Sequence, residues 1–407
     1  MIPLLKLGVV FAGIVLLLSR RWNLGLVLLI ASFAIALLFG YPLWSVVGDA
    51  LVTSVDQLAL RLALAVVLIM TLSELLRETA SLSGMVRALQ ALISSRGLVM
   101  AGLPALIGLL PMVGGAMFSA PMVDEVGDQI GVDQDRKTFV NYWFRHIWEY
   151  VFPLYPSFIL AAALLNLETF QLARATWPLA VAAVLGGAVF GLTGMPRRPR
   201  ERPRPSARRE SLRTLATSTW PVALVIVLSL TLPIDERFTL ILSLFVTIAL
   251  MMAIGRIPLR TLGQILSKRI PWKTVLVLFG ALIFRRVLDN SGAVNAVSEA
   301  LTASQVPLVV VAFAIPFIAG LLTGISVGAF SIGFPVVMPL VAPDGVLTAG
   351  WAAWLMAGGF LGVMCSPLHL CLSLTRVYFK ADWGPVYRRI APSSLGVAVI
   401  AVLLLLR

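Results

Sequence analysis

The sequence predicts an all-α integral membrane protein built from two inverted-topology repeats. Hydrophobic residues make up 59% of the 407 residues and charged residues only 13%, a composition that soluble domains of this size do not have. Apolar stretches of roughly 20 residues recur along the chain, and in lipid each must be helical to satisfy its own backbone polar groups. Three sequence landmarks also recur in the same order at offsets of 208 to 214 residues.

The long apolar stretches predict ten transmembrane helices. We place them at 2–19, 23–45, 57–77, 138–165, 172–194, 216–232, 238–254, 273–289, 348–376 and 390–406. The first stretch lacks the charged front and small-residue cleavage site of a signal peptide, so we expect a retained helix. The two cysteines, Cys365 and Cys371, lie in one apolar stretch and give neither a disulfide framework nor a zinc spacing.

Two further apolar stretches, 97–130 and 305–341, are interrupted near their middles by Gly, Pro and Ser. Such interruptions predict re-entrant hairpins, each made of two half-helices. A short amphipathic segment precedes each hairpin, at 82–95 and 292–304, and we expect both segments to be interfacial helices.

The composition changes sharply between the two halves. The segment 195–214 carries eight arginines between Arg197 and Arg213 and predicts a solvated, non-helical linker. It divides the chain into a first repeat, 1–194, and a second repeat, 215–407. A charge bias of this kind is the ordinary signal of a cytoplasmic loop, so 196–213 is placed in the cytoplasm, and we expect no nucleic-acid partner.

The internal repeat is the most informative pattern in the sequence. A Ser-Gly pair follows an apolar helix in both halves, a Gly-Ala-rich segment ending in Pro lies within both hairpins, and a Trp and a Pro recur at an offset of 211. These matches are Ser83-Gly84 with Ser291-Gly292, Gly115–Pro121 with Gly328–Pro335, Trp143 with Trp354, and Pro156 with Pro367.

Charge indicates that the two copies are inverted. With a cytoplasmic linker, counting spans in both directions places 24 of the 32 basic residues on the cytoplasmic side, as the positive-inside bias predicts. The interfacial segment 82–95 carries Arg87 and is followed by Arg96, whereas its partner 292–304 carries Glu299 and no basic residue. Equivalent segments are therefore predicted on opposite membrane faces.

Inverted repeats with interrupted helices are typical of secondary transporters, which bind substrate near the midplane where the interruptions meet. The hairpin tips are therefore candidate binding sites, because glycines let backbone approach a ligand and hydroxyls can bind it. The alternative is that these small residues serve tight helix packing. The candidates are Gly114, Gly115, Ser119, Thr323, Gly324, Ser326, Gly328 and Ser331.

The helix after each hairpin is also predicted to be broken, because proline near midspan frees carbonyls that could bind a cation. The candidates at the two breaks are Pro156, Ser157, Ser366 and Pro367. Ionisable residues inside a membrane are costly and point to function. Near the breaks these are Arg145, His146, Glu149 and His369.

Two interpretations of these ionisable residues stay open. Arg145 and Glu149 are spaced i, i+4 and could form a structural pair, or they could bind an anion and couple protons. His146, Glu149 and His369 also supply the ligand types of a catalytic zinc site. The sequence contains no His-Glu-x-x-His motif and no evident general base, so we expect no metal and no catalytic residue. The acidic stretch from Asp124 to Asp135 is expected to be a solvated loop with helix caps.

The segment 108–121, Gly-Leu-Leu-Pro-Met-Val-Gly-Gly-Ala-Met-Phe-Ser-Ala-Pro, resembles the signature of an uncharacterised prokaryotic membrane family of the ion-transporter superfamily. That superfamily includes divalent-anion:sodium symporters and gluconate and lactate permeases. The resemblance covers nearly the whole chain and implies a homodimer with an elevator-type transport domain, whose hairpin tips bind a carboxylate and sodium. The dicarboxylate carriers have Ser-Asn-Thr at each tip, and neither tip here has an Asn, which leaves the dicarboxylate and the sodium ion open.

We therefore expect a secondary active transporter for a small organic anion, a carboxylate, in the inner membrane of a prokaryote. Its coupling ion would be Na⁺ or H⁺, it would need no cofactor other than that ion, and it would not be an enzyme. The alternatives are a protein that handles a lipid-linked substrate, which a lateral opening would favour, and an intramembrane metalloenzyme. Contact among His146, Glu149 and His369 would favour the metalloenzyme.

Overall fold

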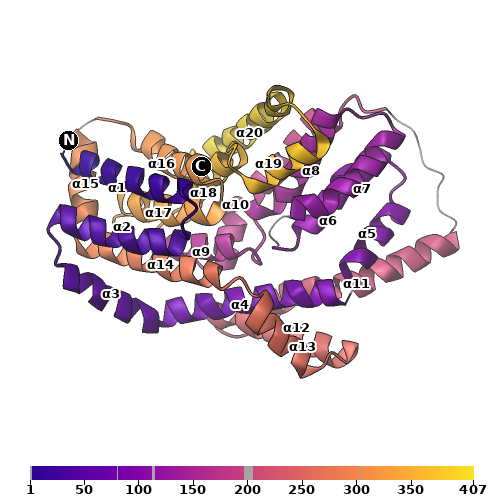
Figure 1. Cartoon of the computed structure of the whole chain (residues 1–407), viewed down its shortest axis with the longest axis horizontal. Helices are drawn as coiled ribbons and strands as arrows, with labels where there is room; N and C mark the ends of the chain where they lie inside the picture. The colour runs from indigo at the N-terminus through magenta and orange to yellow at the C-terminus, as the bar shows by residue number, and fades with distance from the viewer. Residues whose placement is uncertain (1, 80, 112–114, 197–204, 304) are drawn as a thin grey trace.

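The computed structural model of the protein describes residues 2–79, 81–111, 115–196, 205–303 and 305–407, which form helices joined by turns and loops (Figure 1). Within these described residues, six helices are long and apolar enough to cross a membrane, and seven further apolar helices have 10 to 17 residues. The chain is therefore an all-α, multi-pass membrane protein. The six long segments are Ile2–Ser19, Gln57–Glu78, Thr169–Leu192, Arg208–Thr231, Phe238–Gly255 and Trp383–Leu405.

The first half contains ten α-helices, a 3-10 turn (η1) and a π-helical turn (η2) in its described residues. They are α1 Ile2–Ser19, α2 Leu24–Phe39, α3 Leu43–Val55, α4 Gln57–Glu78, α5 Ser81–Leu92, α6 Arg96–Gly108, α7 Gly115–Gln129, α8 Gln134–His146, η1 Ile147–Tyr150, α9 Pro156–Leu164, α10 Thr169–Gly187 and η2 Ala188–Leu192.

The second half contains ten more α-helices and a second π-helical turn (η3) in its described residues. They are α11 Pro205–Thr231, α12 Glu236–Gly255, α13 Leu259–Gln264, η3 Ile265–Arg269, α14 Trp272–Asn290, α15 Ala293–Ala303, α16 Leu308–Thr323, α17 Ser326–Val341, α18 Ala349–Met364, α19 Leu370–Phe379 and α20 Trp383–Leu405.

Both halves contain the predicted series of a short helix, a helix pair and a broken helix. The short helices are α5 and α15, the pairs are α6–α7 and α16–α17, and the broken helices are α8–α9 and α18–α19. Most of the predicted spans therefore correspond to helices or broken helices. The inverted relation of the two halves stays a prediction.

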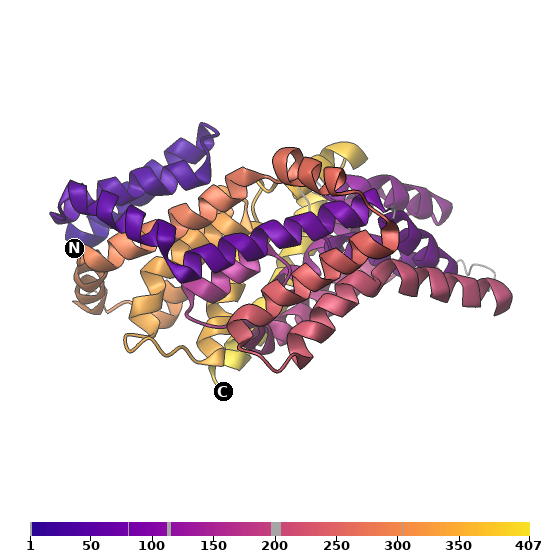
Figure 2. The same ribbon diagram turned by 90° about the horizontal axis from the view of Figure 1, so that it is seen from below.

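Close backbone packing joins the two halves. Helix α2 lies along α14 (Figure 1), and a Cβ added to Gly25 would lie 2.6 Å from the carbonyl oxygen of Leu276. A Cβ on Gly280 would lie 2.7 Å from the carbonyl oxygen of Gly25. Such close approach is the usual role of small residues in membranes. On another face, α12 packs against both α4 and α11 (Figure 2).

Two predicted segments were wrong. The span 23–45 ends early, because Gly40 caps α2 in the left-handed conformation, with φ +76°, and Pro42 precedes a new helix, α3. The second part of the predicted linker is helical, because α11 begins at Pro205. Proline is tolerated in a first turn, and the following Ala, Arg and Glu are compatible with a helix. The surface helix α13 was not predicted.

Candidate functional site

The tip of the second helix pair lies against the break between α18 and α19. Gly324 caps α16 with a φ of +66°, and a Cβ there would lie 2.7 Å from the carbonyl carbon of Leu368. The buried Ser366 donates its hydroxyl hydrogen to the carbonyl oxygen of Leu321, 2.6 Å away. These contacts place two of the predicted binding segments side by side.

The first break carries a buried arginine. Helix α8 ends at His146, the chain continues through η1, and α9 restarts with Pro156 at its first position. The guanidinium of Arg145, 2% exposed, donates to the Tyr155 hydroxyl at 2.9 Å and to the Leu110 carbonyl at 3.5 Å. The Tyr155 hydroxyl in turn donates to the Gly108 carbonyl. The guanidinium is therefore held beside the end of α6.

Glu149 connects the first break to the second helix pair. Its Oε2 accepts a hydrogen bond from the Ser326 hydroxyl at 2.8 Å, and its Oε1 lies 3.9 Å from His146 Nε2. Ser326 is the first residue of α17. In these contacts Arg145 and Glu149 have different partners. The reason is that α8 ends at His146 and the 3-10 turn η1 changes the direction of the chain before Glu149.

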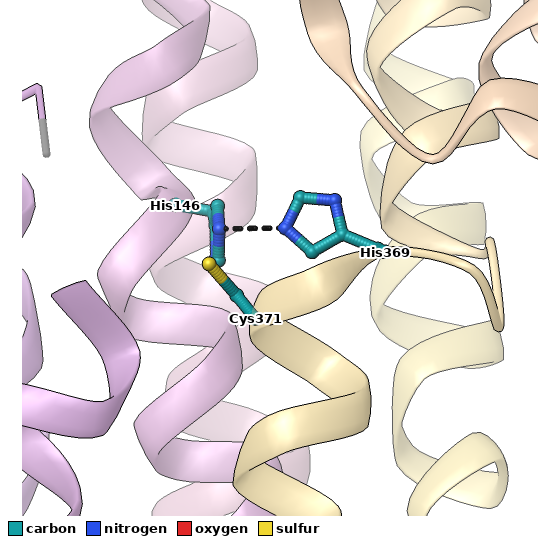
Figure 3. Close-up of side chains that lie close together, drawn as sticks. All are labelled: His146, His369 and Cys371. Carbon is teal, nitrogen blue, oxygen red and sulfur yellow. Dashed lines mark hydrogen bonds between the residues drawn. The ribbon is translucent and has the colours of Figure 1, made fainter. Parts of the chain in front are cut away.

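The two histidines, which the sequence placed 223 positions apart, are in direct contact (Figure 3). Their Nε2 atoms are 3.1 Å apart, and the sulfur of Cys371 completes a group of donor atoms that all lie within 4.8 Å of one another. The contact between His146 and His369, which the sequence left open and which would favour a metal site, is present, and His146 also approaches Glu149. Cys371 was missed although it lies two positions after His369, because the two cysteines by themselves gave no zinc spacing.

The first helix pair is connected to both broken helices through an asparagine. Asn141, in α8, accepts from the Ser119 hydroxyl at 2.6 Å and donates to the Ala116 carbonyl at 2.8 Å. Its amide also donates to the Thr375 hydroxyl, 3.3 Å away. Neither hairpin tip has an Asn in the sequence, and the role of this one on the next helix was not predicted.

The other predicted site residues are placed as follows. Thr323 and Ser331 donate to carbonyls of their own helices, those of Ala319 and Val327, so these hydroxyls serve local structure. Four other candidates, Gly115, Gly328, Pro156 and Ser157, are buried. Pro367 is exposed, and Gly114 lies outside the described residues.

The acidic stretch was expected to be a solvated loop, but its first part, Asp124 to Asp128, lies in the helix α7. Lys137, 1% exposed, forms ion pairs with Asp124 at 2.7 Å and Asp128 at 2.5 Å. Asp133 caps α8 by accepting from the Arg136 amide, as expected. The lysine therefore joins α7 to the start of α8, at the opposite end of α8 from His146.

Comparisons with known proteins agree with this fold. The model of a family described as "Protein of unknown function (DUF401)" matches residues 4–407. The structure resembles the crystal structure of the YdaH transporter of Alcanivorax borkumensis, with a TM-score of 0.55 and 16% identity over 89% of this chain and 86% of that chain. No curated protein matches the sequence.

Proposed function

We propose that this chain, which belongs to the DUF401 family and shares the fold of a transporter, is a secondary active transporter for a small carboxylate. The observation that carries the proposal is the buried guanidinium of Arg145, beside the point where both helix breaks meet the tip of α16–α17. A buried charge inside a membrane is costly and marks substrate or ion pathways.

The chemistry of this junction suits a carboxylate. Helix α17 begins here, and a helix N-terminus presents free N–H groups and a positive dipole end. The carboxylate of Glu149 already binds at this helix start, through the Ser326 hydroxyl. A substrate carboxylate would bind between the same helix start and Arg145, whose planar guanidinium suits a carboxylate.

Transport would follow the elevator-type alternating access that we expect from two inverted halves. In this proposal the helix pairs and broken helices move as a transport domain against the other helices, in a homodimer in the cytoplasmic membrane of a prokaryote. Coupling would use Na⁺, bound by carbonyls that the breaks leave free, or H⁺. That the chain is not an enzyme stays a prediction.

The first test is a thermal-shift screen of the purified protein against small carboxylates, with and without sodium and at two pH values. A ligand at a hundred times its Kd stabilises the folded state by about 2.7 kcal/mol. We expect at least one carboxylate to raise the Tm, and sodium or pH dependence of that shift to identify the coupling ion. Uptake of the same compound into proteoliposomes then tests transport. If no carboxylate shifts the Tm under any condition, the substrate class is wrong.

A further inference from the structure

The cluster of His146, His369 and Cys371 brings both halves of the chain together within the membrane. His146 is the last residue of α8, His369 precedes α19, and Cys371 lies in the first turn of α19. The two histidines are only 2% and 7% exposed, and their rings pack edge to face (Figure 3). Two imidazoles and a thiol are donors that late first-row transition metals prefer.

The ring of His146 is oriented as in metal sites. Its Nδ1 lies 2.6 Å from the carbonyl oxygen of Tyr142, and because a carbonyl can only accept, Nδ1 carries the proton. The neutral ring then has its lone pair on Nε2, which faces His369. Metal-ligating histidines usually donate their other N–H to a carbonyl or carboxylate in this way.

The spacing of the two nitrogens also fits. Tetrahedral zinc with Zn–N distances of about 2.0–2.1 Å holds its nitrogen ligands roughly 3.3 Å apart. The two Nε2 atoms are 3.1 Å apart. Zinc would take the place of the hydrogen bond between the rings, and the Cys371 sulfur, within 4.8 Å of both, would move closer by a side-chain rotation.

Glu149 is placed to supply the fourth ligand. Its Oε1 lies 3.9 Å from His146 Nε2, and its other oxygen is held by Ser326, as ligating carboxylates usually are. A zinc ion with one thiolate and one carboxylate is neutral overall, which suits a site away from water. The nearby Arg145 opposes a cation, but its guanidinium is bound to Tyr155 and Leu110.

We propose that His146, His369, Cys371 and Glu149 form a binding site for zinc(II). This site goes beyond the transport proposal and does not depend on it, because binding is measured without substrate. The competing interpretation is a plain hydrogen bond between two histidines, which would join α8 to α19 without any ion. That interpretation gives no role to the cysteine sulfur.

The test uses the full-length protein, stripped of metal with a chelator and returned to chelator-free detergent buffer. Cobalt(II) is the probe, because tetrahedral cobalt absorbs strongly and a thiolate ligand adds a charge-transfer band in the near ultraviolet. We expect both features in the wild type at one cobalt per chain, and we expect zinc to displace them. The absence of both features at stoichiometric cobalt would overturn the proposal.

Matched variants assign the ligands. Cys371→Ser should abolish the charge-transfer band and weaken zinc binding at least 100-fold, whereas Cys365→Ser, at the second cysteine six positions earlier in the same broken helix, should keep both. His369→Gln should weaken zinc binding to a similar extent. If Cys371→Ser does not fold, His369→Gln is the variant that tests whether zinc binds at this cluster. Retention of the band in Cys371→Ser, or its loss in Cys365→Ser, would contradict the assignment.

Discussion

The two broken helices occupy corresponding places in the sequence but present different chemistry. The first, α8–α9, carries Arg145, His146 and Glu149, and the arginine and histidine are almost completely buried. The second, α18–α19, carries His369 at its break but no arginine, lysine or carboxylate there, and two of its residues, Pro367 and Leu368, are exposed.

What the two broken helices share is their anchoring. The indole N–H of Trp143 donates to the Ala183 carbonyl at 2.7 Å, and that of Trp354 donates to the Val309 carbonyl at 2.8 Å. Indole N–H groups need such partners when buried. Corresponding helices thus keep similar anchors while their breaks differ. The first break contacts the tip of α16–α17 through a carboxylate, that of Glu149, and the second contacts it through backbone packing at Gly324 and the Ser366 hydroxyl.

The largest expected effect is at the first break. Arg145→Ala removes the buried guanidinium, and loss of one partner of a buried charged pair costs about 2–5 kcal/mol, so carboxylate affinity should fall at least roughly 30-fold. Isothermal titration with the carboxylate found in the screen measures this. Arg145→Lys keeps the charge but not the planar fork and should bind with intermediate affinity. Unchanged affinity in Arg145→Ala would move substrate recognition away from the first break.

A smaller effect is expected at the second break, where Gly324 meets Leu368. Gly324→Ala forces a left-handed alanine and also places a Cβ 2.7 Å from the Leu368 carbonyl carbon. Gly131→Ala is the matched control, since Gly131 has a φ of +68° and nothing within 4 Å of an added Cβ.

The control, Gly131→Ala, should lower the free energy of unfolding only by the left-handed penalty, about 1–2 kcal/mol. Gly324→Ala should lower it by about 1–3 kcal/mol more, because the added Cβ is overpacked against Leu368. The apparent Tm of each purified variant measures the difference. Equal Tm values for the two variants would show that the contact with Leu368 does not constrain the tip.

The smallest effect tests the bond between the first break and α17. Ser326→Ala removes the hydroxyl that donates to Glu149, worth about 1 kcal/mol, so carboxylate affinity should change roughly fivefold. Ser331→Ala, in the same helix, removes only a bond to the Val327 carbonyl and should change affinity by less than about twofold. Titration of both variants compares them, and equal effects would remove Ser326 from the site.

The sequence predicted the helix pairs and broken helices because their signals are local. Apolar length, and Gly or Pro near the middle of a span, act on the backbone of the same segment. The gap between α2 and α3 was missed although Gly40 and Pro42 mark it, since the surrounding run of apolar residues suggested one continuous span.

The candidate site was predicted in part. Arg145, His146, Glu149 and His369 stood out because ionisable residues are rare in apolar stretches. Cys371, Asn141 and Tyr155 did not, because their roles depend on contacts with distant segments: Asn141 reaches Thr375 across 234 positions. Such pairs are set by tertiary packing, which single-sequence patterns do not encode.

The contacts of Gly324 and Ser366 have a mechanical consequence. Backbone packs on backbone at Gly324, and the Ser366 hydroxyl is bonded to the end of α16, so the tip of α16–α17 and the break of α18–α19 are joined at two points. A movement of the tip alone would have to break this hydrogen bond and separate the two packed backbones. A joint shift of α16–α19 would keep both contacts.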